Sequence, residues 1–424
     1  MTGFVKDNRR LFLRKLALAS AGMAVAGKAS AQSSVVDILQ SPQRGAWDDQ
    51  FDATGSRNKA AVNNRLPILS APTASYVEGA MVQYRDIVAR GGWPRVNARQ
   101  ALKVGVRDNA VSELRRRLFV SGDLPQQAGD SPTFDTFLDE ALKRFQERHG
   151  MVADGVVGNY TLQALNVPAD VRLGQLETNL VRLRAMSGYL GDRYVMVNSP
   201  AAEIEAVRND RVDLRHKAIV GKIDRQTPIL SSKIHEVILN PYWTAPKSII
   251  RKDIIPLMRE DPTYLTRNKI RLFDNQGNEV PPEFVDWSTE EAVSLRFRQD
   301  PGKINAMSST KINFYNPHAV YMHDTPQQSL FGQFLRFESS GCVRVHNIRE
   351  LTTWLLETDP TWDRRRIEQV ITTGVNTEIA VPVEVPVYFV YVSAWSNNAG
   401  VVHFRDDIYG RDGVDSLRLT QNTL

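Results

Sequence analysis

The chain of 424 residues contains a single cysteine, Cys342, within the sequence ESSGCVRVHN at 338–347. A lone cysteine has no internal disulfide partner, so it is either a small buried apolar residue or a thiol that is used chemically. His323 stands nineteen positions earlier, after the apolar run 319–322, where a predicted strand ends and side chains can reach a cleft. An imidazole beside a thiol can generate the thiolate that attacks in acyl transfer, although a lone histidine also has an ordinary structural use.

The residues around the cysteine suit the same chemistry. Gly341 lets the main chain approach a substrate, and the amides of Gly341 and Cys342 can donate to the oxygen that becomes negative in a tetrahedral intermediate. Asn347 and Glu350 have the spacing of a capping box, which predicts that a helix begins there. That helix has an apolar face formed by Ile348, Leu351 and Leu355. We therefore expect the cysteine to be fixed between a strand end and a helix start.

The segment from His323 to Arg344 resembles the signature of L,D-transpeptidases with a YkuD-type catalytic domain. In that pattern a histidine and a spacer precede Ser or Thr, His, Gly, Cys, an apolar residue and Arg or Asn; here the residues read H-D-T-P, then S-S-G-C-V-R-V. The resemblance extends from about residue 193 to the C-terminus, and the whole chain resembles the large multidomain Gram-negative transpeptidases. Ser340 departs from the pattern, because many members have histidine there. The usual base matches His323, so the departure is expected to change the pocket and leave catalysis intact.

The resemblance implies a peptidoglycan L,D-transpeptidase. Cys342 would attack the carbonyl of the bond between the diamino acid and the terminal D-alanine of a tetrapeptide stem, D-alanine would leave, and a thioester would remain. The side-chain amine of a second stem would then attack that thioester, giving a crosslink between two diamino acids. His323 would be the base, with its other ring nitrogen held by the main-chain carbonyl of Asp324, whose carboxylate we expect to be a turn former. Two alternatives stay open: a carboxypeptidase or endopeptidase that gives the same acyl-enzyme to water, and a silent wall-binding scaffold.

Three further residues match the substrate pocket of that family: Tyr321, Ser340 and Arg344. Arg344 either meets a stem carboxylate or braces the loop. Trp243 either lines the substrate channel or belongs to the core. The sequence has no H-E-x-x-H motif, no C-x-x-C motif and no histidine pair at metal-ligand spacing, so no metal and no cofactor are predicted.

The pattern along the chain predicts an α+β protein made of two folded parts. Three amphipathic helices are predicted within residues 101–167, and the string ALKRFQERHGMVADGVVGNYTLQALN resembles the peptidoglycan-binding helical repeat module. That resemblance implies a glycan or peptide ligand, with a packing spacer or a substrate-orienting arm as the alternative. The second part is sheet-rich, with a hairpin over 202–214 and a helical cap inserted at about 247–302.

The cap is expected to be ordered through four apolar residues: Ile249, Ile250, Ile254 and Leu257. Helices are also predicted over 73–90 and 173–186, the first packing on a later domain. Near the C-terminus, strands over 381–395 and 401–404 are expected to form a hairpin that closes the catalytic sheet.

The first thirty-one residues have a basic start, an apolar stretch and an Ala-x-Ala site, as export signals do. The paired Arg9 and Arg10 favour the twin-arginine route, with ordinary secretion as the alternative. A periplasmic protein without stable membrane insertion is expected. The net charge of +5 comes from mixed Lys, Arg, Asp and Glu, which does not indicate nucleic acid. The predicted parts are the export signal (1–31), a lead-in segment (32–100), the helical module (101–167), a connecting helix (168–192) and the catalytic domain (193–424).

Overall fold

The computed structural model describes residues 62, 64–125, 129–186, 188 and 190–413, all within one unit of the chain. The predicted export signal and much of the lead-in segment lie outside the described residues.

The predicted helical module is confirmed. Its helices are α4 (Asn109–Val120), α5 (Thr136–Arg148) and α6 (Asn159–Leu165). Asp108 and Asp135 cap the first two, each accepting a hydrogen bond from a main-chain amide of the first turn. The apolar faces meet in one core that includes Leu114, Leu142 and Phe145. The spacing of the apolar residues was sufficient to locate all three helices, because each helix buries only one face.

The catalytic part is built on a mixed sheet of nine strands in the order β11-β3-β12-β10-β9-β4-β13-β1-β2. An additional pairing joins β2, the last strand of this order, to β3, the second, so the sheet from β3 to β2 closes on itself. In chain order the strands are β1 (Arg193–Asn198), β2 (Glu203–Arg208), β3 (Arg211–Gly221), β4 (Leu230–Leu239), β9 (Thr310–Phe314), β10 (Met322–His323), β11 (Phe337–Ser339), β12 (Val343–Val345) and β13 (Thr377–Val390). The predicted hairpin is confirmed as β2 and β3.

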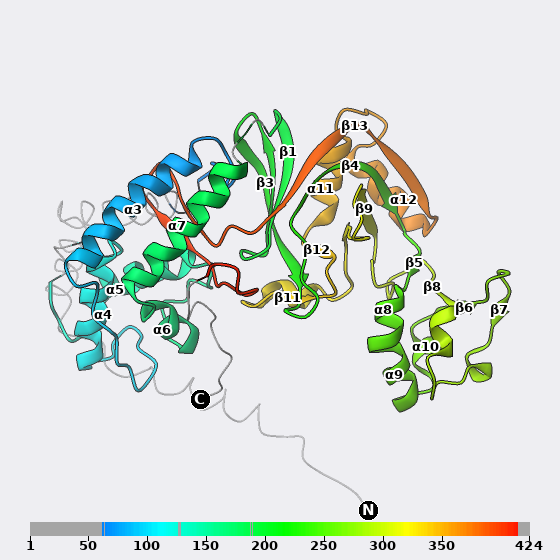
Figure 1. The fold of residues 1–424 in the computed structure, drawn as a ribbon, viewed down its shortest axis with the longest axis horizontal. Coiled ribbons are helices and arrows are strands. Elements are labelled where there is room, and N and C mark those ends of the chain that lie inside the picture. The colour runs from blue at the N-terminus through cyan, green and yellow to red at the C-terminus, as the bar shows by residue number, and fades with distance from the viewer. Residues whose placement is uncertain (1–61, 63, 126–128, 187, 189, 414–424) are drawn as a thin grey trace, which may run out of the picture. The chain divides into compact units, whose positions relative to one another are not determined.

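Helices cover both faces of the sheet around β1. Val195 and Val197 face a core shared with α11 (Ile348–Leu356) and α12 (Arg364–Thr373), whereas Tyr194 and Met196 face a second core. That second core is shared with α3 (Thr73–Ala89) and α7 (Ala169–Met186), which run side by side in Figure 1. Alternate side chains of a strand point to opposite faces, so a strand buried on both faces is apolar throughout. The helix predicted over 73–90 therefore does pack on a later part of the chain.

The insertion between β4 and β9 has its own apolar core, separate from that of the sheet. It is only half helical. Its helices are α8 (Lys247–Ile249), the π-helix η2 (Ile250–Ile254), α9 (Ile255–Glu260) and α10 (Tyr264–Arg267), followed by the short 3-10 turns η3 (Pro282–Phe284) and η4 (Glu291–Ser294). The remainder is a small antiparallel sheet, visible beside the helices in Figure 1, made of β5 (Trp243–Thr244), β6 (Ile270–Phe273), β7 (Glu279–Val280) and β8 (Arg296–Gln299). Ile250 and Ile254 are buried as predicted, but Leu257 is exposed.

The C-terminal strands differ from the prediction. β13 lies inside the sheet, between β4 and β1, and the hairpin of β14 (Ala394–Ser396) and β15 (Val402–Phe404) forms a separate two-stranded sheet. The hairpin therefore does not close the catalytic sheet. Pro382 and Pro386 precede the residues of β13 that pair with β1, so they lie where the strand has β4 on one side only.

Candidate active site

The strands β9, β10 and β12 bring the predicted catalytic pair to one face of the sheet. β10 is parallel to β12, with Met322 opposite Val343 and His323 opposite Arg344. The side chains of Met322 and Val343 point into the core beneath the sheet. Because side chains alternate between faces, His323 and Arg344 point the other way. Cys342 directly precedes β12 and lies two residues before Arg344, so strand alternation extended by one residue would put it on the face of His323. The charges of Lys311 and Arg344, which lie on that face, both act on the Cys342 sulfur.

Cys342 is half-buried, and its Sγ lies 4.0 Å from the carbonyl oxygen of Ala319. Burial raises the pKa of the thiol, and hydrogen bonds from the main chain and hydroxyl of Tyr321 oppose that rise, as do the charges of Lys311 and Arg344. Desolvation is the larger effect, so the sulfur is protonated at neutral pH. The cysteine therefore needs a base at the moment of attack.

His323 is buried and held in one orientation. Its Nδ1 donates a hydrogen bond to the carbonyl oxygen of Asp324 over 2.6 Å, which leaves Nε2 as the proton acceptor. The predicted role of the Asp324 carbonyl is thereby confirmed. Burial, followed by the positive charge of Arg344, lowers the pKa of His323 to about 3, with Lys311 adding to the effect. The imidazole is therefore neutral, the form that can accept a proton.

The Asp324 carboxylate shapes the turn after β10, as predicted. It accepts hydrogen bonds from the Ser309 hydroxyl at 2.6 Å, the Thr325 amide at 2.8 Å and the Gln328 side chain at 3.0 Å. A buried carboxylate with this many donors has little capacity left for a substrate. Its contribution to the site is to fix the main-chain carbonyl that orients His323.

The loop before Cys342 is held by hydrogen bonds from two hydroxyl groups. The Ser339 hydroxyl donates to the Cys342 carbonyl and accepts from the Gly341 amide at 3.2 Å. The Thr227 hydroxyl donates to the Gly341 carbonyl and accepts from the Gly221 amide, both at 2.9 Å. Gly341 has a φ of +110°, which requires glycine. Its amide is thus already used within the loop, and of the two predicted oxyanion donors only the Cys342 amide remains a candidate.

The capping box predicted at Asn347 is wrong. Asn347 has a φ of +52°, in the left-handed region, and its side chain makes no cap hydrogen bond. An N-cap residue needs an extended main chain to turn its side chain onto the first free amides, so this conformation excludes the motif. The helix itself is present as α11, anchored by its apolar face.

Tyr321 connects the cysteine to the inserted cap. Its hydroxyl lies close enough to the Cys342 sulfur and to Trp243 of β5 for both to affect its pKa. Burial, followed by the charge of the neighbouring sulfur, raises the pKa of Tyr321, so the phenol stays a donor. The ammonium of Lys311 lies 4.6 Å from the centre of the Tyr321 ring. Trp243 is half-buried against the cap core, so it serves as a core residue that also reaches the site.

Ser340 and Arg344 each have a protein partner. Ser340 is exposed, and its hydroxyl accepts a hydrogen bond from Arg225 at 2.8 Å. The same guanidinium donates two hydrogen bonds to the Asp253 carboxylate of η2, at 2.6 and 2.9 Å. Arg344 donates to the Gln327 side chain at 3.0 Å, the contact expected of a loop-bracing residue, while its buried Nε has no hydrogen-bond partner among the described residues. Substrate binding by either residue stays a prediction.

Comparison with known families identifies both folded parts. Residues 192–375 match the model described as the YkuD L,D-transpeptidase catalytic domain. Residues 107–165 match a second model, described as "Putative peptidoglycan binding domain". The first match contains His323, Gly341 and Cys342. Residues 192–375 are thus similar to the YkuD catalytic domain over somewhat less than half of the chain.

Two curated proteins are similar to parts of this chain. A protein of Haemophilus influenzae named "Putative L,D-transpeptidase" is 36% identical over 239 residues, which are 56% of this chain and 48% of that protein. The chain thus spans about half the length of this relative. The N-acetylmuramoyl-L-alanine amidase CwlM of Mycobacterium tuberculosis is 39% identical over 89 residues, 19% of this chain and 22% of that protein.

A solved L,D-transpeptidase from Stackebrandtia nassauensis covers 70% of this chain and 96% of its own, with 12% identity and a TM-score of 0.24. Another, from Mycobacterium smegmatis, covers 47% of this chain and 58% of its own, with 12% identity and a TM-score of 0.23.

Four residues of the YkuD domain that sequence reasoning did not single out contact the site: Lys311, Thr227, Ser339 and Arg225. Lys311 lies on β9 directly opposite His323. A charged residue within the apolar alternation of β9 was the one available signal, since it marks an outward-facing position. The other three are ordinary loop or strand-end residues whose partners are distant in sequence, and no spacing pattern indicates them.

Within the described ranges, no three or more His, Cys, Asp or Glu side chains are grouped so that they could hold a metal ion. In the same part of the chain, no helix combines the length and apolar character needed to cross a bilayer. The absence of a metal or cofactor in the YkuD domain stays a prediction.

Proposed function

We propose that this chain is a peptidoglycan L,D-transpeptidase that works through a thioester at Cys342. The observation that supports this most is the match to the YkuD catalytic domain over 192–375, a range that includes Cys342 and the oriented imidazole of His323. Peptidoglycan as the substrate is supported by both domain matches. The crosslink between two diamino acids is the finer proposal, carried by the resemblance of the signature.

The geometry supports the following first half-reaction. The Cys342 sulfur attacks the carbonyl carbon before the terminal D-alanine of a tetrapeptide stem while Nε2 of His323 takes the thiol proton. Because thiol and imidazole are both neutral at rest, proton transfer accompanies formation of the carbon–sulfur bond. The Cys342 amide is the candidate donor to the resulting oxyanion. The carbon–nitrogen bond then breaks, and D-alanine leaves with the proton from His323.

In the second half-reaction an amine of another stem attacks the thioester carbonyl. His323 accepts the proton of that amine and returns it to the sulfur as the carbon–sulfur bond breaks. The positive charges of Lys311 and Arg344 favour the negatively charged sulfur as it departs. The products are a crosslinked pair of stems and the free thiol of Cys342.

Product masses test this proposal against its alternatives. The purified protein would be incubated with disaccharide tetrapeptides and the mixture analysed by liquid chromatography and mass spectrometry, with Cys342→Ser as the matched control. A crosslinked dimer that requires Cys342 supports transpeptidation. Trimmed stems without a dimer would mean that water is the acceptor, and retained wall binding without any product would mean a scaffold.

We also propose that the protein is exported to the periplasm, by the twin-arginine route. The support is the basic and apolar pattern of residues 1–31, which lie outside the described residues, together with a substrate found outside the cytoplasm. Fractionation of cells that express the wild type or the double variant Arg9→Lys, Arg10→Lys tests the route. Unchanged export of the double variant would exclude it.

A further inference from the structure

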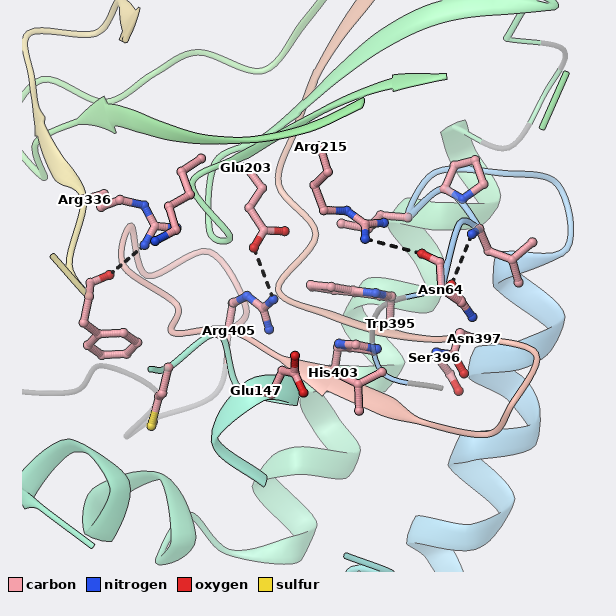
Figure 2. A pocket seen from close by; sticks show the side chains of 18 of the residues that line it. Asn64, Glu147, Glu203, Arg215, Arg336, Trp395, Ser396, Asn397, His403 and Arg405 are labelled. Carbon is pink, nitrogen blue, oxygen red and sulfur yellow. Dashed lines mark hydrogen bonds and ion pairs between the residues drawn. The ribbon is translucent and has the colours of Figure 1, made fainter. Parts of the chain in front are cut away.

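A pocket lies apart from Cys342, where the helical module meets the catalytic sheet. It has a volume of about 320 Å³, and its walls come from four places: the lead-in segment at 62–76, the module turn at 147–152, strands β2 and β3, and the hairpin β14–β15 with the loop before β11. Figure 2 shows this pocket. None of the proposed catalytic or substrate-binding residues lines it. Its volume is that of a site for a small molecule.

Two arginines of the pocket wall are about nine-tenths buried. Arg336 is 6% exposed and Arg405 is 9% exposed. All the hydrogen bonds of Arg336 go to main-chain carbonyls, including those of Ala218 and Phe334, at 3.2 and 3.4 Å. Arg405 likewise donates to the carbonyls of Arg148 and Phe404. Carbonyl groups satisfy the N–H donors but do not neutralise the guanidinium charge.

The carboxylates near Arg336 and Arg405 are too few to neutralise the positive charges around them. Glu203 lies 3.7 Å from Arg405 and directly opposite Lys217 in the pairing of β2 with β3, so several cations share one carboxylate. Arg215 is paired with the buried Glu205, at 2.6 Å, which stands behind the pocket wall. Figure 2 shows Glu203, Arg215, Arg336 and Arg405 around the same space.

The charge of the pocket follows from its wall. The lining cations are Arg215, Lys217, Arg336 and Arg405, and the lining carboxylates are Glu147 and Glu203. Even when Glu205 is assigned to Arg215, four cations face three carboxylates. His403 does not add a charge near neutral pH, because burial and the nearby guanidinium of Arg405 lower its pKa well below the ordinary value. One positive charge in excess thus remains, and for a partly buried cluster this is unfavourable without an anion.

Gly150 of the module turn completes the pocket. It has a φ of +72°, and a Cβ built on it would come within 2.6 Å of Nε of Arg405. The buried Nε of Arg405 has no hydrogen-bond partner among the described residues. The glycine therefore lets the module pack against the arginine, and the site exists only when the module and the catalytic part are docked.

We propose that this pocket binds the carboxylate of a small ligand, about the size of a dipeptide or a single sugar acid. The carboxylate sits near Arg405 and Lys217 and competes with Glu203 for them, while Arg215 and Arg336 contribute their charge. This site is independent of the chemistry at Cys342. Such a carboxylate is found at the end of a peptide and on a sugar acid, and the experiment separates these two sources.

Isothermal titration calorimetry at low salt tests the proposal. The probes are N-acetyl-D-alanine with its amide as the neutral match, and N-acetylmuramic acid with N-acetylglucosamine as the neutral match. We expect at least one acid to bind and neither neutral match to bind. The acid that binds identifies the source as a peptide or a saccharide. Binding is expected to be unchanged in Cys342→Ser, which excludes the catalytic cleft as the site.

Two substitutions give effects of opposite sign. Lys217→Gln removes an exposed cation and should weaken binding by roughly two- to five-fold, whereas Glu203→Gln removes the competing carboxylate and should tighten it by a similar factor. Thermal unfolding confirms that each variant is folded. Effects of the same sign, binding of the neutral matches, or binding of inorganic phosphate but of neither acid would each overturn the proposal.

Discussion

At the scale of single residues, the site depends on two groups that burial keeps uncharged. Desolvation raises the pKa of the Cys342 thiol and lowers that of His323, so no thiolate–imidazolium pair stands ready at neutral pH. The proposed acyl transfer would then rely on a substrate that brings its carbonyl close enough for the proton to move during attack. A protonated thiol of this kind reacts slowly with reagents that need a preformed thiolate.

The rate of alkylation as a function of pH measures the protonation state of the Cys342 thiol directly. The rate of reaction of Cys342 with iodoacetamide should be low at pH 7 and should still be rising beyond the ordinary thiol pKa of about 8.5. Lys311→Met should shift the profile further to high pH, because the lysine charge favours the thiolate. Intact-protein mass spectrometry follows the reaction at this lone cysteine. A rate that levels off below pH 7 would mean that a standing thiolate exists.

Thr227 is the residue that we expect to position the nucleophile loop. It is 1% exposed, and its hydroxyl joins the Gly221 amide to the Gly341 carbonyl. Thr227→Val keeps the shape but leaves both groups unpaired, which should cost about 1 to 3 kcal/mol in the free energy of unfolding. The rate of acylation should fall by about tenfold or more, because the cysteine loses its fixed orientation.

Thr227→Ser is the matched control, since it restores the hydroxyl and should restore most of the rate. Acylation kinetics and urea unfolding would be measured on both variants. Equal rates for the valine and serine variants would show that the hydroxyl does not position the loop.

At the scale of elements, an arginine links the cap to the nucleophile loop. Arg225 joins Asp253 of η2 to Ser340, two residues before Cys342. Its side chain is 18% exposed, so this pair is better shielded than most surface ion pairs. The hydroxyl of Ser340 thus serves as an attachment point for the cap.

Removal of this link should loosen η2. In Arg225→Met we expect faster amide hydrogen exchange over Ile250–Ile254 and a lower kcat/KM for tetrapeptide stems, with little change in overall stability. Arg251→Met is the control. Arg251 lies in η2, as Asp253 does, but it pairs with Glu290 inside the cap and not with the loop before Cys342. If both variants exchange and react alike, the link to Ser340 has no special role.

The elements also show how far a sequence can be interpreted. The module helices and the β2–β3 hairpin were predictable because local periodicity determines them. The cap sheet was not, since its strands of two to four residues are too short to show alternation. The interior place of β13 was missed because its partners, β4 and β1, are more than a hundred residues away. Asn347 had the right type and spacing for a cap but the wrong φ, which tertiary packing imposes.

At the scale of the whole molecule, buried histidines tie stability to pH. His149 and His403 stand near the junction of module and sheet, and His323 stands in the site. Burial is the first cause that lowers the pKa of all three, followed by the charge of Arg148 for His149, Arg405 for His403 and Arg344 for His323. Above pH 6.5 both folded and unfolded chains hold them neutral. Below pH 6.5, only the unfolded chain takes up protons on these imidazoles. The free energy of unfolding therefore decreases as the pH decreases.

We expect the free energy of unfolding to drop by roughly 1 kcal/mol per buried imidazole between pH 7 and 5.5. At lower pH, Glu205 and Asp412 oppose the fall, because burial raises their pKa values and the folded state takes up protons there. Urea unfolding at several pH values gives the slope of the free energy of unfolding against pH. His403→Gln should reduce this slope. His318→Gln is the control, because His318 is exposed. A slope that His403→Gln leaves unchanged would contradict this account.

The most direct test of the central claim is the intact mass of the protein after exposure to tetrapeptide stems. The wild type should gain the mass of the stem less D-alanine, on Cys342, and the adduct should disappear when an amine acceptor is added. Cys342→Ser should gain nothing, and His323→Asn should form the adduct far more slowly. An unmodified wild type, or an adduct that persists in Cys342→Ser, would contradict a thioester formed by Cys342 with His323 as its base.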